Sequence, residues 1–397
     1  MIDEVTVVEM PSGQSYTGQN QAELFCHGGQ FVLKKTLGEI LRHGVRPAEP
    51  GEFTRRAFLA GRIDLARAEA VAEIIASKTE YAYNAARKNL LGELSDDIEQ
   101  LRRKSVELLA EIEASIDFPE EDIEPAERSR RLDDLDAIIV RIKELIESYR
   151  SGKLIKEGYR IAIGGRTNAG KSSLFNLLLN QSRAIVATVP GTTRDYLTEW
   201  IDLDGMAVAL TDTAGLRDSS DVVEKAGQES ARAIIREADL TIWMVDISEG
   251  DWAKTLDDDL PDIKRLSGII IVLNKVDLLD TPPRLKSLAD YREAPIILSC
   301  RTRRGLQEVK KELSARINAN LPDLTDRLVI TSERHKRKLA EALRTFRKAR
   351  RGLKDDIEPE LLAVEIRSGL NAIDEITGRV YNEEVLDRIF SKFCIGK

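Results

Sequence analysis

One stretch of the chain reads Gly165-Arg166-Thr167-Asn168-Ala169-Gly170-Lys171-Ser172. It has the spacing of a phosphate-binding P-loop, in which Gly-Lys-Ser follows a first glycine after four residues. The apolar residues of 159–164 predict a buried strand before it, and residues 173–179 predict a helix after it. This order points backbone N–H groups and the positive end of a helix dipole at a polyphosphate. We therefore expect Lys171 to reach the β- and γ-phosphates and the Ser172 hydroxyl to bind Mg²⁺.

Four further stretches follow in the order of a Ras-like guanine-nucleotide-binding domain. In Gly191-Thr-Thr-Arg-Asp195, Thr193 is placed to ligate Mg²⁺ and to sense the γ-phosphate. Asp212-Thr-Ala-Gly215 ends an apolar run that predicts a strand. Asp212 is expected to hold Mg²⁺ through a water molecule, and the amide of Gly215 to face the γ-phosphate.

The last two stretches predict a guanine pocket. In Asn274-Lys-Val-Asp277, the Asp277 carboxylate can accept two hydrogen bonds from guanine, whereas adenine offers neither donor there. The backbone of Ser299-Cys-Arg301 is expected to contact the guanine O6, although Cys300 stands where alanine is usual. Five stretches in register predict a GTPase domain. The residues predicted to bind nucleotide are Asn168, Ala169, Gly170, Lys171, Ser172, Ser173, Ala187, Thr188, Val189, Pro190, Gly191, Thr192, Thr193, Asp212, Thr213, Ala214, Gly215, Asn274, Lys275, Val276, Asp277, Ser299, Cys300 and Arg301.

The residue that positions the attacking water is not evident from these motifs. Leu216 stands where Ras-like proteins carry a glutamine, and a leucine side chain cannot orient water. Glu224 is the candidate replacement, although the acids of residues 217–224 are equally explained as a solvated loop. Asn168 is also open to two interpretations, a loop residue without a role or a ligand of a monovalent cation beside the β- and γ-phosphates.

The composition and net charge of the whole chain limit the class of protein and the partners that it can have. The chain has 397 residues, enough for two or three domains, and is 42% hydrophobic and 32% charged, which is typical of core-forming proteins. Because the formal net charge is -8, any RNA contact must use a local basic patch, and we expect no DNA partner. The three cysteines form no CxxC motif, which argues against a disulfide scaffold or structural zinc. We find no apolar run of membrane-spanning length and expect a cytoplasmic location without a membrane partner.

Two helical regions flank the nucleotide-binding stretches. Apolar residues recur at helical spacing at Leu94, Ile98, Leu101, Leu108, Ile112 and Ile116, then at Leu132, Leu135, Ile138, Ile142 and Leu145, and again at Leu362, Ile366, Leu370, Ile373, Ile376 and Val380. We expect Ser151-Gly152 to end the helix before the P-loop strand, and Asn382 to cap a last helix.

Neither helical half can bury its apolar stripe alone. We therefore predict an α/β plus α architecture in which residues 61–157 and 319–397 pack into one discontinuous all-helical domain. A Ras-like P-loop GTPase domain, residues 158–318, is inserted between them. Residues 1–60 mix strand-like runs with a helical stretch and predict a small α+β domain.

The motifs resemble those of the TrmE–Era–EngA–septin branch of GTPases, and the flanking segments narrow the resemblance. Cys26-His-Gly-Gly29, Pro50-Gly-Glu-Phe-Thr-Arg-Arg-Ala-Phe58, Asp117-Phe-Pro119 and the terminal Cys394-Ile-Gly-Lys397 are similar to segments of the MnmE/TrmE family of tRNA-modification GTPases. Ile63-Asp-Leu-Ala and the following Ala68-Glu-Ala70 add to it. The resemblance extends over essentially the whole chain.

This resemblance implies an activity and a set of ligands. It implies GTP hydrolysis stimulated by K⁺ when two G domains meet, and an FAD-containing partner protein. Together the two proteins are expected to modify C5 of the wobble uridine of certain tRNAs, placing an aminomethyl or carboxymethylaminomethyl group with a one-carbon unit from a tetrahydrofolate derivative. It also implies a homodimer through the N-terminal domain. The residues that match the family's sites are Asn168, Ala187, Val189 and Thr192 for K⁺, Ser172 and Thr193 for Mg²⁺, Glu224 for the catalytic water, and Glu23, Arg62 and Lys397 for folate.

The chain departs from the family pattern in two places. Family members begin a segment earlier, with a folate-contacting arginine that is missing here, so we expect an N-terminally incomplete folate-binding-type domain. Arg62 stands where the family often has lysine, and the two cations differ in their hydrogen-bond geometry.

Three further features each allow more than one interpretation. Cys394 is a catalytic thiol, a nearby redox group or a small buried residue. Cys26-His27 fits a turn better than a metal or thiol site. Residues 331–354 carry ten Lys or Arg against two Glu on a predicted helix with apolar positions Leu339, Leu343 and Phe346, either a solvated face or a tRNA contact.

Two other functions stay possible on the motifs alone. One is a ribosome-assembly GTPase of the Era/EngA type without modification chemistry. The terminal Cys-Ile-Gly-Lys and the folate-like N-terminal segment argue against it. The other is a filament-forming GTPase of the septin kind, which the long predicted helices do not resemble.

Overall fold

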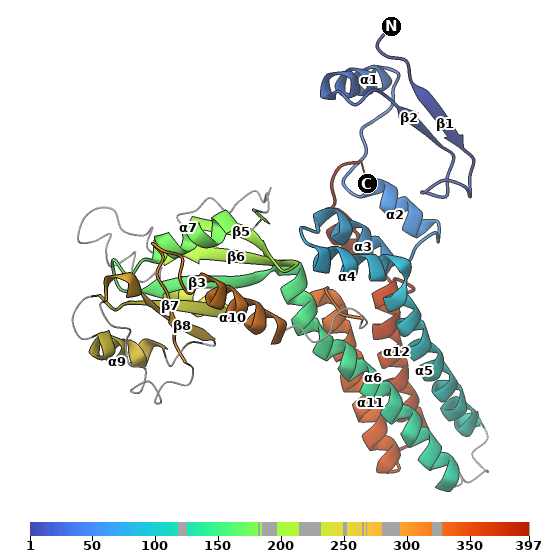
Figure 1. The fold of residues 1–397 in the computed structure, drawn as a ribbon. Coiled ribbons are helices and arrows are strands. Elements are labelled where there is room, and N and C mark those ends of the chain that lie inside the picture. Colours follow the sequence, from blue (N-terminus) through green and yellow to red (C-terminus); the bar gives the residue numbers. More distant parts are fainter. Residues whose placement is uncertain are drawn as a thin grey trace, which may run out of the picture. The chain divides into compact units, whose positions relative to one another are not determined.

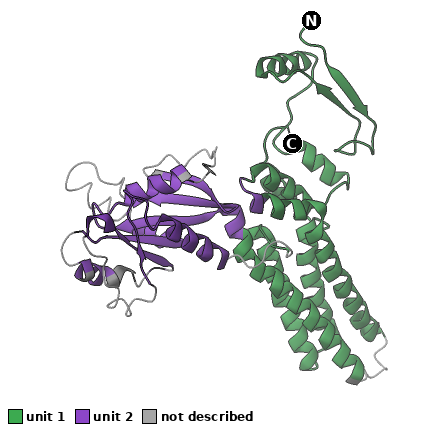
Figure 2. Ribbon diagram, viewed as in Figure 1, with its two compact units in different colours: residues 1–77, 83–152, 328–397 green, residues 78–82, 153–327 purple. Residues whose placement is uncertain are grey.

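The computed structural model describes residues 1–117, 125–181, 183–184, 197–213, 232–248, 252–263, 266, 268–279, 294–319 and 328–396. The chain divides into two units (Figure 2). The first joins three segments, Met1–Ser77, Tyr83–Gly152 and Leu328–Lys397. The second joins two segments, Lys78–Ala82 and Lys153–Arg327.

The second unit is built on a seven-stranded sheet (Figure 1). In spatial order its strands are β4 (Arg183–Ala184), β5 (Leu197–Leu203), β6 (Met206–Asp212), β3 (Tyr159–Gly165), β7 (Leu240–Asp246), β8 (Ile269–Asn274) and β9 (Ile296–Ile297). From β6 to β9 the neighbouring strands are parallel, whereas β5 pairs antiparallel with β6 and with β4. All seven residues of β6 are buried, as expected for an inner strand of a covered sheet.

Helices follow four strands of this sheet, β3, β7, β8 and β9 in chain order. They are α7 (Lys171–Gln181), α9 (Trp252–Ile263), the short 3₁₀ helix η2 (Val276–Leu278) and α10 (Leu306–Ala319). The α7 helix packs against β3 and β6, and α9 packs against β7. The hairpin between β5 and β6 turns through Asp204 and Gly205, both with positive φ (52° and 85°), which is the backbone of a type I′ turn.

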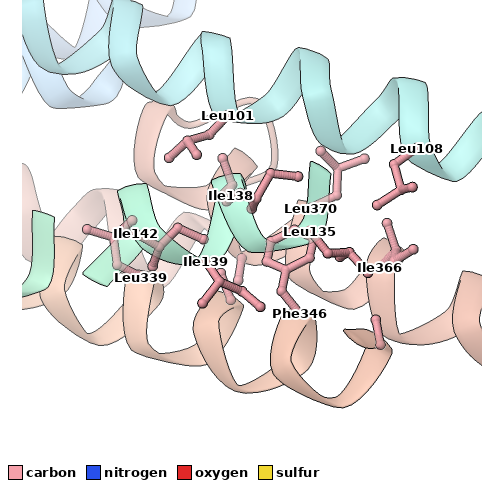
Figure 3. Packing of buried hydrophobic residues seen from close by; sticks show 14 of the residues in the cluster. Leu101, Leu108, Leu135, Ile138, Ile139, Ile142, Leu339, Phe346, Ile366 and Leu370 are labelled. Atoms are coloured by element: carbon pink, nitrogen blue, oxygen red, sulfur yellow. The ribbon is translucent and has the colours of Figure 1, made fainter. Parts of the chain in front are cut away.

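The first unit contains a long helical bundle. Its helices are α2 (Glu52–Leu59), α3 (Leu65–Ala76), α4 (Glu80–Leu91), α5 (Glu93–Asp117), α6 (Pro125–Glu157), α11 (Glu333–Lys354), α12 (Pro359–Thr377) and α13 (Glu383–Phe390), of which α4 and α6 also extend into the second unit. One buried core joins both halves of the sequence, with Leu101, Ile138, Leu339 and Ile366 each 3% exposed or less (Figure 3). The predicted packing of the two helical halves into one domain is therefore what the structure shows.

Gly152 does not end its helix, and this prediction is wrong. The α6 helix continues to Glu157 and stops at Gly158, whose φ is +83°. A Cβ atom at position 152 would lie 2.1 Å from the backbone oxygen of Ile330. Gly152 therefore lets the chain before α11 pass close to α6 and does not act as a helix terminator.

Val380 does not continue the apolar stripe of α12, which corrects a second prediction. The helix ends at Thr377 because Gly378 adopts the left-handed conformation (φ +78°), and Val380 is 48% exposed. The predicted cap of the last helix is confirmed, since the Asn382 side chain accepts a hydrogen bond from the amide of Glu384 at 2.9 Å.

The N-terminal segment exposes much of its apolar surface. Strands β1 (Thr6–Met10) and β2 (Gln21–Phe25) form an antiparallel pair, followed by α1 (Gln30–Arg42). None of the residues described for α1 is buried, and Val7, Phe25 and Phe31 are 51%, 56% and 74% exposed. An exposed apolar surface of this kind is typical of a region that binds another chain or segment.

The predicted fold class is confirmed: a parallel-rich P-loop sheet is inserted into a discontinuous helical domain, after a small α+β segment. The boundaries after residues 60, 157 and 318 stay a prediction. Within the described ranges, no helix combines the length and the apolar character that crossing a membrane requires.

Candidate nucleotide-binding site

The P-loop lies between β3 and α7, at the carboxyl end of a central strand (Figure 1). Gly165 has φ +131°, and a Cβ atom there would lie 2.2 Å from the backbone oxygen of Met244. Gly170 has φ +99°, and its Cβ would meet Nδ2 of Asn274 at the same separation of 2.2 Å. Both glycines of the motif are therefore required by close approaches, and the loop has the tight shape that cradles phosphates.

Lys171 opens α7 and turns back into the loop. Its Nζ donates to the backbone oxygens of Gly165 (3.0 Å) and Arg166 (2.8 Å), and the residue is only 8% exposed. The ammonium is thus held at the centre of the predicted phosphate cradle. Ser172 and Ser173 follow in the first turn of α7 with exposed side chains, beside the positive end of the helix dipole.

Asn274 connects the P-loop to the segments that are predicted to bind guanine. Its side chain is buried (2% exposed), and Nδ2 donates to the backbone oxygen of Ala169 at 2.8 Å. Its Oδ1 accepts from the amide of Cys300 at 3.1 Å. Three of the predicted stretches therefore meet at one carboxamide, which sets their spacing.

Among the described residues, no hydrogen bond or ion pair involves the Asp277 carboxylate. Asp277 lies in η2 with an exposed side chain, beyond Lys275, whose backbone is left-handed (φ 69°). Nζ of Lys275 forms an ion pair with Oδ2 of Asp246 at 2.5 Å. Sequence reasoning missed Asp246, although an aspartate that ends the apolar strand β7 beside β8 was a usable signal.

The loop after β9 is stabilised by its own hydrogen bonds. The Ser299 amide donates to the oxygen of Arg304 (2.9 Å), and the Thr302 amide donates to Ser299 Oγ (3.1 Å). Burial raises the pKa of the Cys300 thiol to about 11, with the Asp277 charge acting in the same direction. The thiol is therefore neutral at physiological pH, and its replacement of alanine brings no charge to the predicted guanine pocket.

The first residues of the Asp-x-x-Gly stretch lie beside the P-loop strand. Asp212 pairs in register with Ile163 of β3 and is 1% exposed, and Thr213 Oγ1 donates to the backbone oxygen of Ile163 at 2.7 Å. A hydroxyl on Ser172 and a carboxylate on Asp212 are oxygen donors of the class that Mg²⁺ prefers. Among the residues that the structure describes, no group of three or more His, Cys, Asp or Glu forms a metal cluster.

A second contact of the P-loop was not predicted from sequence. The guanidinium of Arg166 donates from Nε (3.1 Å) and Nη2 (3.0 Å) to Oδ1 of Asp259 in α9. Oδ2 of the same carboxylate accepts from Trp243 Nε1 at 3.1 Å. Asp259 thus ties the loop to β7 and α9, and no local sequence pattern points to this pairing.

The backbone conformation at position 168 is enough to explain an asparagine there, with no need for a bound ligand. Its φ is +62°, in the left-handed region that asparagine tolerates better than most residues, and its side chain is exposed. Its role as a cation ligand stays a prediction. Ten other predicted residues lie outside the described ones: Ala187, Thr188, Val189, Pro190, Gly191, Thr192, Thr193, Ala214, Gly215 and Glu224.

The predicted folate residues have other hydrogen-bond partners in the described part of the chain. Arg62 Nη1 donates to the backbone oxygen of Gly13 (2.9 Å), whereas the Glu23 carboxylate, on β2, accepts from Gln21 Nε2 (2.9 Å). No ion pair or hydrogen bond links Glu23 with Arg62 there, and Lys397 lies outside the described residues. Their common site stays a prediction.

The three cysteines are free. Cys394 is exposed, so the interpretation as a small buried residue is wrong. Its backbone oxygen accepts from the Gly51 amide at 3.4 Å. His27 is held by Asp3, through Nδ1 and through its amide, both at 2.8 Å, and the Gly29 amide donates back to its oxygen. This is the geometry of a turn, as expected from Cys26-His27.

Comparison with known proteins gives matches along the whole chain. The family model described as the MnmE helical domain matches residues 65–394, and the GTP-binding protein TrmE N-terminus matches residues 1–62. A tRNA modification GTPase MnmE from Carboxydothermus hydrogenoformans is 39% identical over 404 residues, covering 100% of this chain and 86% of that protein. Proteins of the same name from Heliobacterium modesticaldum and Aquifex aeolicus are 41% and 40% identical, each covering 100% of this chain and 86% and 87% of their own length.

The chain belongs to the MnmE/TrmE family. The resemblance inferred from the motifs is therefore confirmed. In this member of the MnmE/TrmE family, Lys171 turns back into the P-loop, and Asn274 links that loop to the Cys300 loop. The guanine contact of Asp277 stays a prediction.

Proposed function

We propose that this chain is a GTP hydrolase that acts in tRNA modification. The observation that carries the proposal is the Asn274 side chain, which joins the P-loop at Ala169 to the Cys300 loop next to Asp277. These two hydrogen bonds support a single site in which the P-loop binds the phosphates and Asp277 selects guanine. The role in tRNA modification is supported by relatives of that name, which are 39% to 41% identical to this chain over its full length.

The finer chemistry of the proposal rests on the family resemblance. The chain acts with an FAD-containing partner protein on C5 of the wobble uridine of certain tRNAs. The product carries an aminomethyl or carboxymethylaminomethyl group whose one-carbon unit comes from a tetrahydrofolate derivative. The residues proposed to bind this folate are Glu23, Arg62 and Lys397. Cys394 is exposed near the chain end, which is compatible with a thiol that takes part in this chemistry.

The proposed cations of the GTPase site are Mg²⁺ and K⁺. Ser172 and Thr193 are the proposed Mg²⁺ ligands, and the buried Asp212 carboxylate beside the P-loop strand supports an oxygen-rich site. Asn168 and Thr192, with the backbones of Ala187 and Val189, are the proposed K⁺ ligands. A cation there supplies positive charge to the transferring phosphoryl group, as an arginine finger does in other GTPases.

Glu224 is the proposed residue that orients the attacking water, because Leu216 cannot do so. Changing Glu224 to Ala is expected to retain GTP binding and lose most of the turnover, since only the transition state uses the carboxylate. Nucleotide affinity and single-turnover hydrolysis are measured on the same preparation. Hydrolysis at the wild-type rate contradicts the assignment.

The protein is proposed to be cytoplasmic and to form a homodimer through its N-terminal segment. The G domains of the two chains are proposed to meet transiently. The exposed apolar residues Val7, Phe25 and Phe31 support the first contact, because such a surface is stabilised when a second chain covers it.

One experiment tests the proposed function directly. The gene is deleted and restored with the full-length chain, and the nucleosides of the host tRNA are analysed by mass spectrometry. We expect the modified wobble uridine to disappear on deletion and to return with the wild-type chain. Unchanged uridine modification after deletion contradicts a role in this chemistry.

A further inference from the structure

The α11 helix separates its cations into two sets. It has ten Lys or Arg between residues 331 and 354. Four of them pair with acids on the bundle: Arg334 with Glu69, Lys338 with Glu341 and Glu375, Lys348 with Glu365, and Arg350 with Asp136. These four have a structural role, which accounts for part of the basic composition. Six cations remain: Lys336, Arg337, Arg344, Arg347, Arg351 and Lys354.

Three of the remaining cations form a straight row, which we call the arginine row: Arg337, Arg344 and Arg351. They recur every seventh residue, so they lie on one face of the helix about 10 Å apart along its axis. All three are exposed. Residues of the opposite face, such as Leu339, Phe346 and Leu353, are buried in the bundle core. The row therefore points away from the core.

The arginine row has no protein partner in the described part of the chain. No hydrogen bond or ion pair involves the guanidinium groups of Arg337, Arg344 or Arg351 there. Arg347 is likewise exposed and unpaired among the described residues, and Lys336 lies over the ring of Tyr149 at 4.6 Å. The acids of the helix are Glu333 in its first turn and Glu341, which pairs with Lys338. Within α11 itself, ten Lys or Arg thus stand against two Glu.

Helix stabilisation and solubility explain only some of the exposed cations on α11. Cations in the last turn of a helix are stabilised by its dipole, which explains Arg351 and Lys354. The effect falls off within one turn and does not reach Arg337 or Arg344. Solubility does not require them either, because the chain already has a formal net charge of -8, and each arginine makes that charge smaller in magnitude.

We propose that the arginine row binds the phosphate backbone of the tRNA substrate. The inference rests on the proposed function and adds the place where the RNA lies. Guanidinium groups hold phosphate oxygens through paired N–H donors, and a row of such groups at a spacing of one heptad suits a sequence-independent backbone contact better than a protein interface. On an acidic protein, such a local patch also orients the RNA, because the rest of the surface repels it.

The test compares two triple variants of the full-length chain. The first changes Arg337, Arg344 and Arg351 to Gln. The control changes three exposed cations on other helices, Arg87 in α4 and Arg103 and Lys104 in α5, to Gln, with the same change in net charge. Binding of a fluorescently labelled tRNA transcript is followed by anisotropy between about 50 and 200 mM KCl. GTP hydrolysis without tRNA and thermal unfolding are recorded for both variants.

We expect the row variant to bind tRNA at least about tenfold more weakly at the lowest salt concentration. The slope of log affinity against log salt should decrease by about 2 to 3, since each phosphate contact contributes roughly 0.7 to 0.9. The control variant should keep most of the slope, and basal hydrolysis should not change in either. Changing the row to Lys should preserve the salt slope, because charge is retained. The single change of Arg344 to Gln should lower the slope by about 1.

Other results separate the alternatives. Equal affinity and slope in wild type and row variant, or equal losses in row and control variants, overturn the row as an RNA site. The row variant could also bind tRNA normally but lose wobble modification when the partner protein is present. That result overturns RNA as the ligand and assigns the row to an acidic protein surface. Wild-type chain that binds no tRNA at any salt concentration contradicts the proposed function itself.

Discussion

The Asn274 carboxamide donates a hydrogen bond from Nδ2 to the backbone oxygen of Ala169, over 2.8 Å. These residues are 105 positions apart, and the bond holds the last turn of the P-loop against the end of β8. Because the oxygen of the same carboxamide accepts from the Cys300 amide, a single buried side chain links the P-loop to the loop predicted to contact guanine.

Replacing Asn274 with Ala is expected to weaken GTP and GDP binding by about 10- to 100-fold. The change leaves the Ala169 oxygen and the Cys300 amide without their partner, which costs roughly 1 to 3 kcal/mol. Isothermal titration with both nucleotides measures the loss. The exposed Asn180, at the end of α7, provides a matched Asn-to-Ala control that should bind normally. Equal affinities for the two variants would mean that the P-loop keeps its shape without the tether.

Changing Asp277 to Asn should shift nucleotide preference from GTP towards xanthosine triphosphate. The C2 carbonyl of xanthine accepts a hydrogen bond from an amide, whereas the exocyclic amine of guanine loses its acceptor. Competition between the two triphosphates for a labelled nucleotide gives the ratio of affinities. We expect this ratio to reverse, and an unchanged preference for GTP would place the guanine contact elsewhere.

Substituting NaCl for KCl at constant ionic strength should slow GTP hydrolysis, by tenfold or more if the cation acts as an arginine finger does. The physical reason is that the proposed Asn168 site selects a cation by its size and hydration. Multiple-turnover rates in the two salts are compared at saturating Mg²⁺, with nucleotide affinity as the control. Equal rates in both salts rule out a potassium site with a catalytic role.

Replacement with Ala should destabilise the protein at Gly152 but not at Gly38. At Gly152 the new Cβ would lie 2.1 Å from the Ile330 oxygen, so the change should lower the unfolding temperature by several degrees. At Gly38, within α1, nothing lies within 4 Å of the new Cβ, and Ala should leave stability equal or raise it by up to about 1 kcal/mol. Thermal unfolding followed by circular dichroism checks both. Similar effects at the two positions would show that helix propensity, and not the close approach, decides the outcome.

Glu69 should make the stability of the first unit sensitive to acid. Burial opposes its ionised form, but the charges of His335 and Arg334, bonded to it at 2.6 and 2.9 Å, outweigh burial and lower its pKa far below the usual 4.5. A lowered pKa means that the carboxylate stabilises the fold at neutral pH, and that this contribution declines as the pH falls below about 4.5. Changing Glu69 to Gln should cost about 3 kcal/mol at pH 7 and flatten the acid dependence of unfolding.

The matched control for this prediction is Glu365 changed to Gln. Glu365 pairs with Lys348, whose side chain is 51% exposed, so its loss should cost less than about 1 kcal/mol. Urea unfolding between pH 3 and 7 gives the free energies of both variants. If the two variants show the same cost and the same pH profile, the buried network contributes no more than a surface ion pair.

The sequence alone determined the nucleotide-binding elements and the family. P-loop chemistry is local, since the glycines, Lys171 and the flanking strand and helix are contiguous, so their spacing specifies their geometry. Helical periodicity likewise predicted the faces of α5, α6 and α12 that form the core, because an amphipathic stripe of this length has to be buried.

The contacts between distant segments could not be predicted from local sequence patterns. Gly152 reads as a helix terminator in sequence, but the passing Ile330 backbone makes it a position of close approach inside α6. The pairs Arg166–Asp259 and Lys275–Asp246 depend on which strands are neighbours in the sheet. The sequence does not distinguish the Lys and Arg residues of α11 from one another. Acids of the surrounding bundle form ion pairs with some of them, whereas those of the arginine row stay exposed. Local spacing specifies backbone conformation, whereas pairing of charges depends on neighbours that only the folded chain supplies.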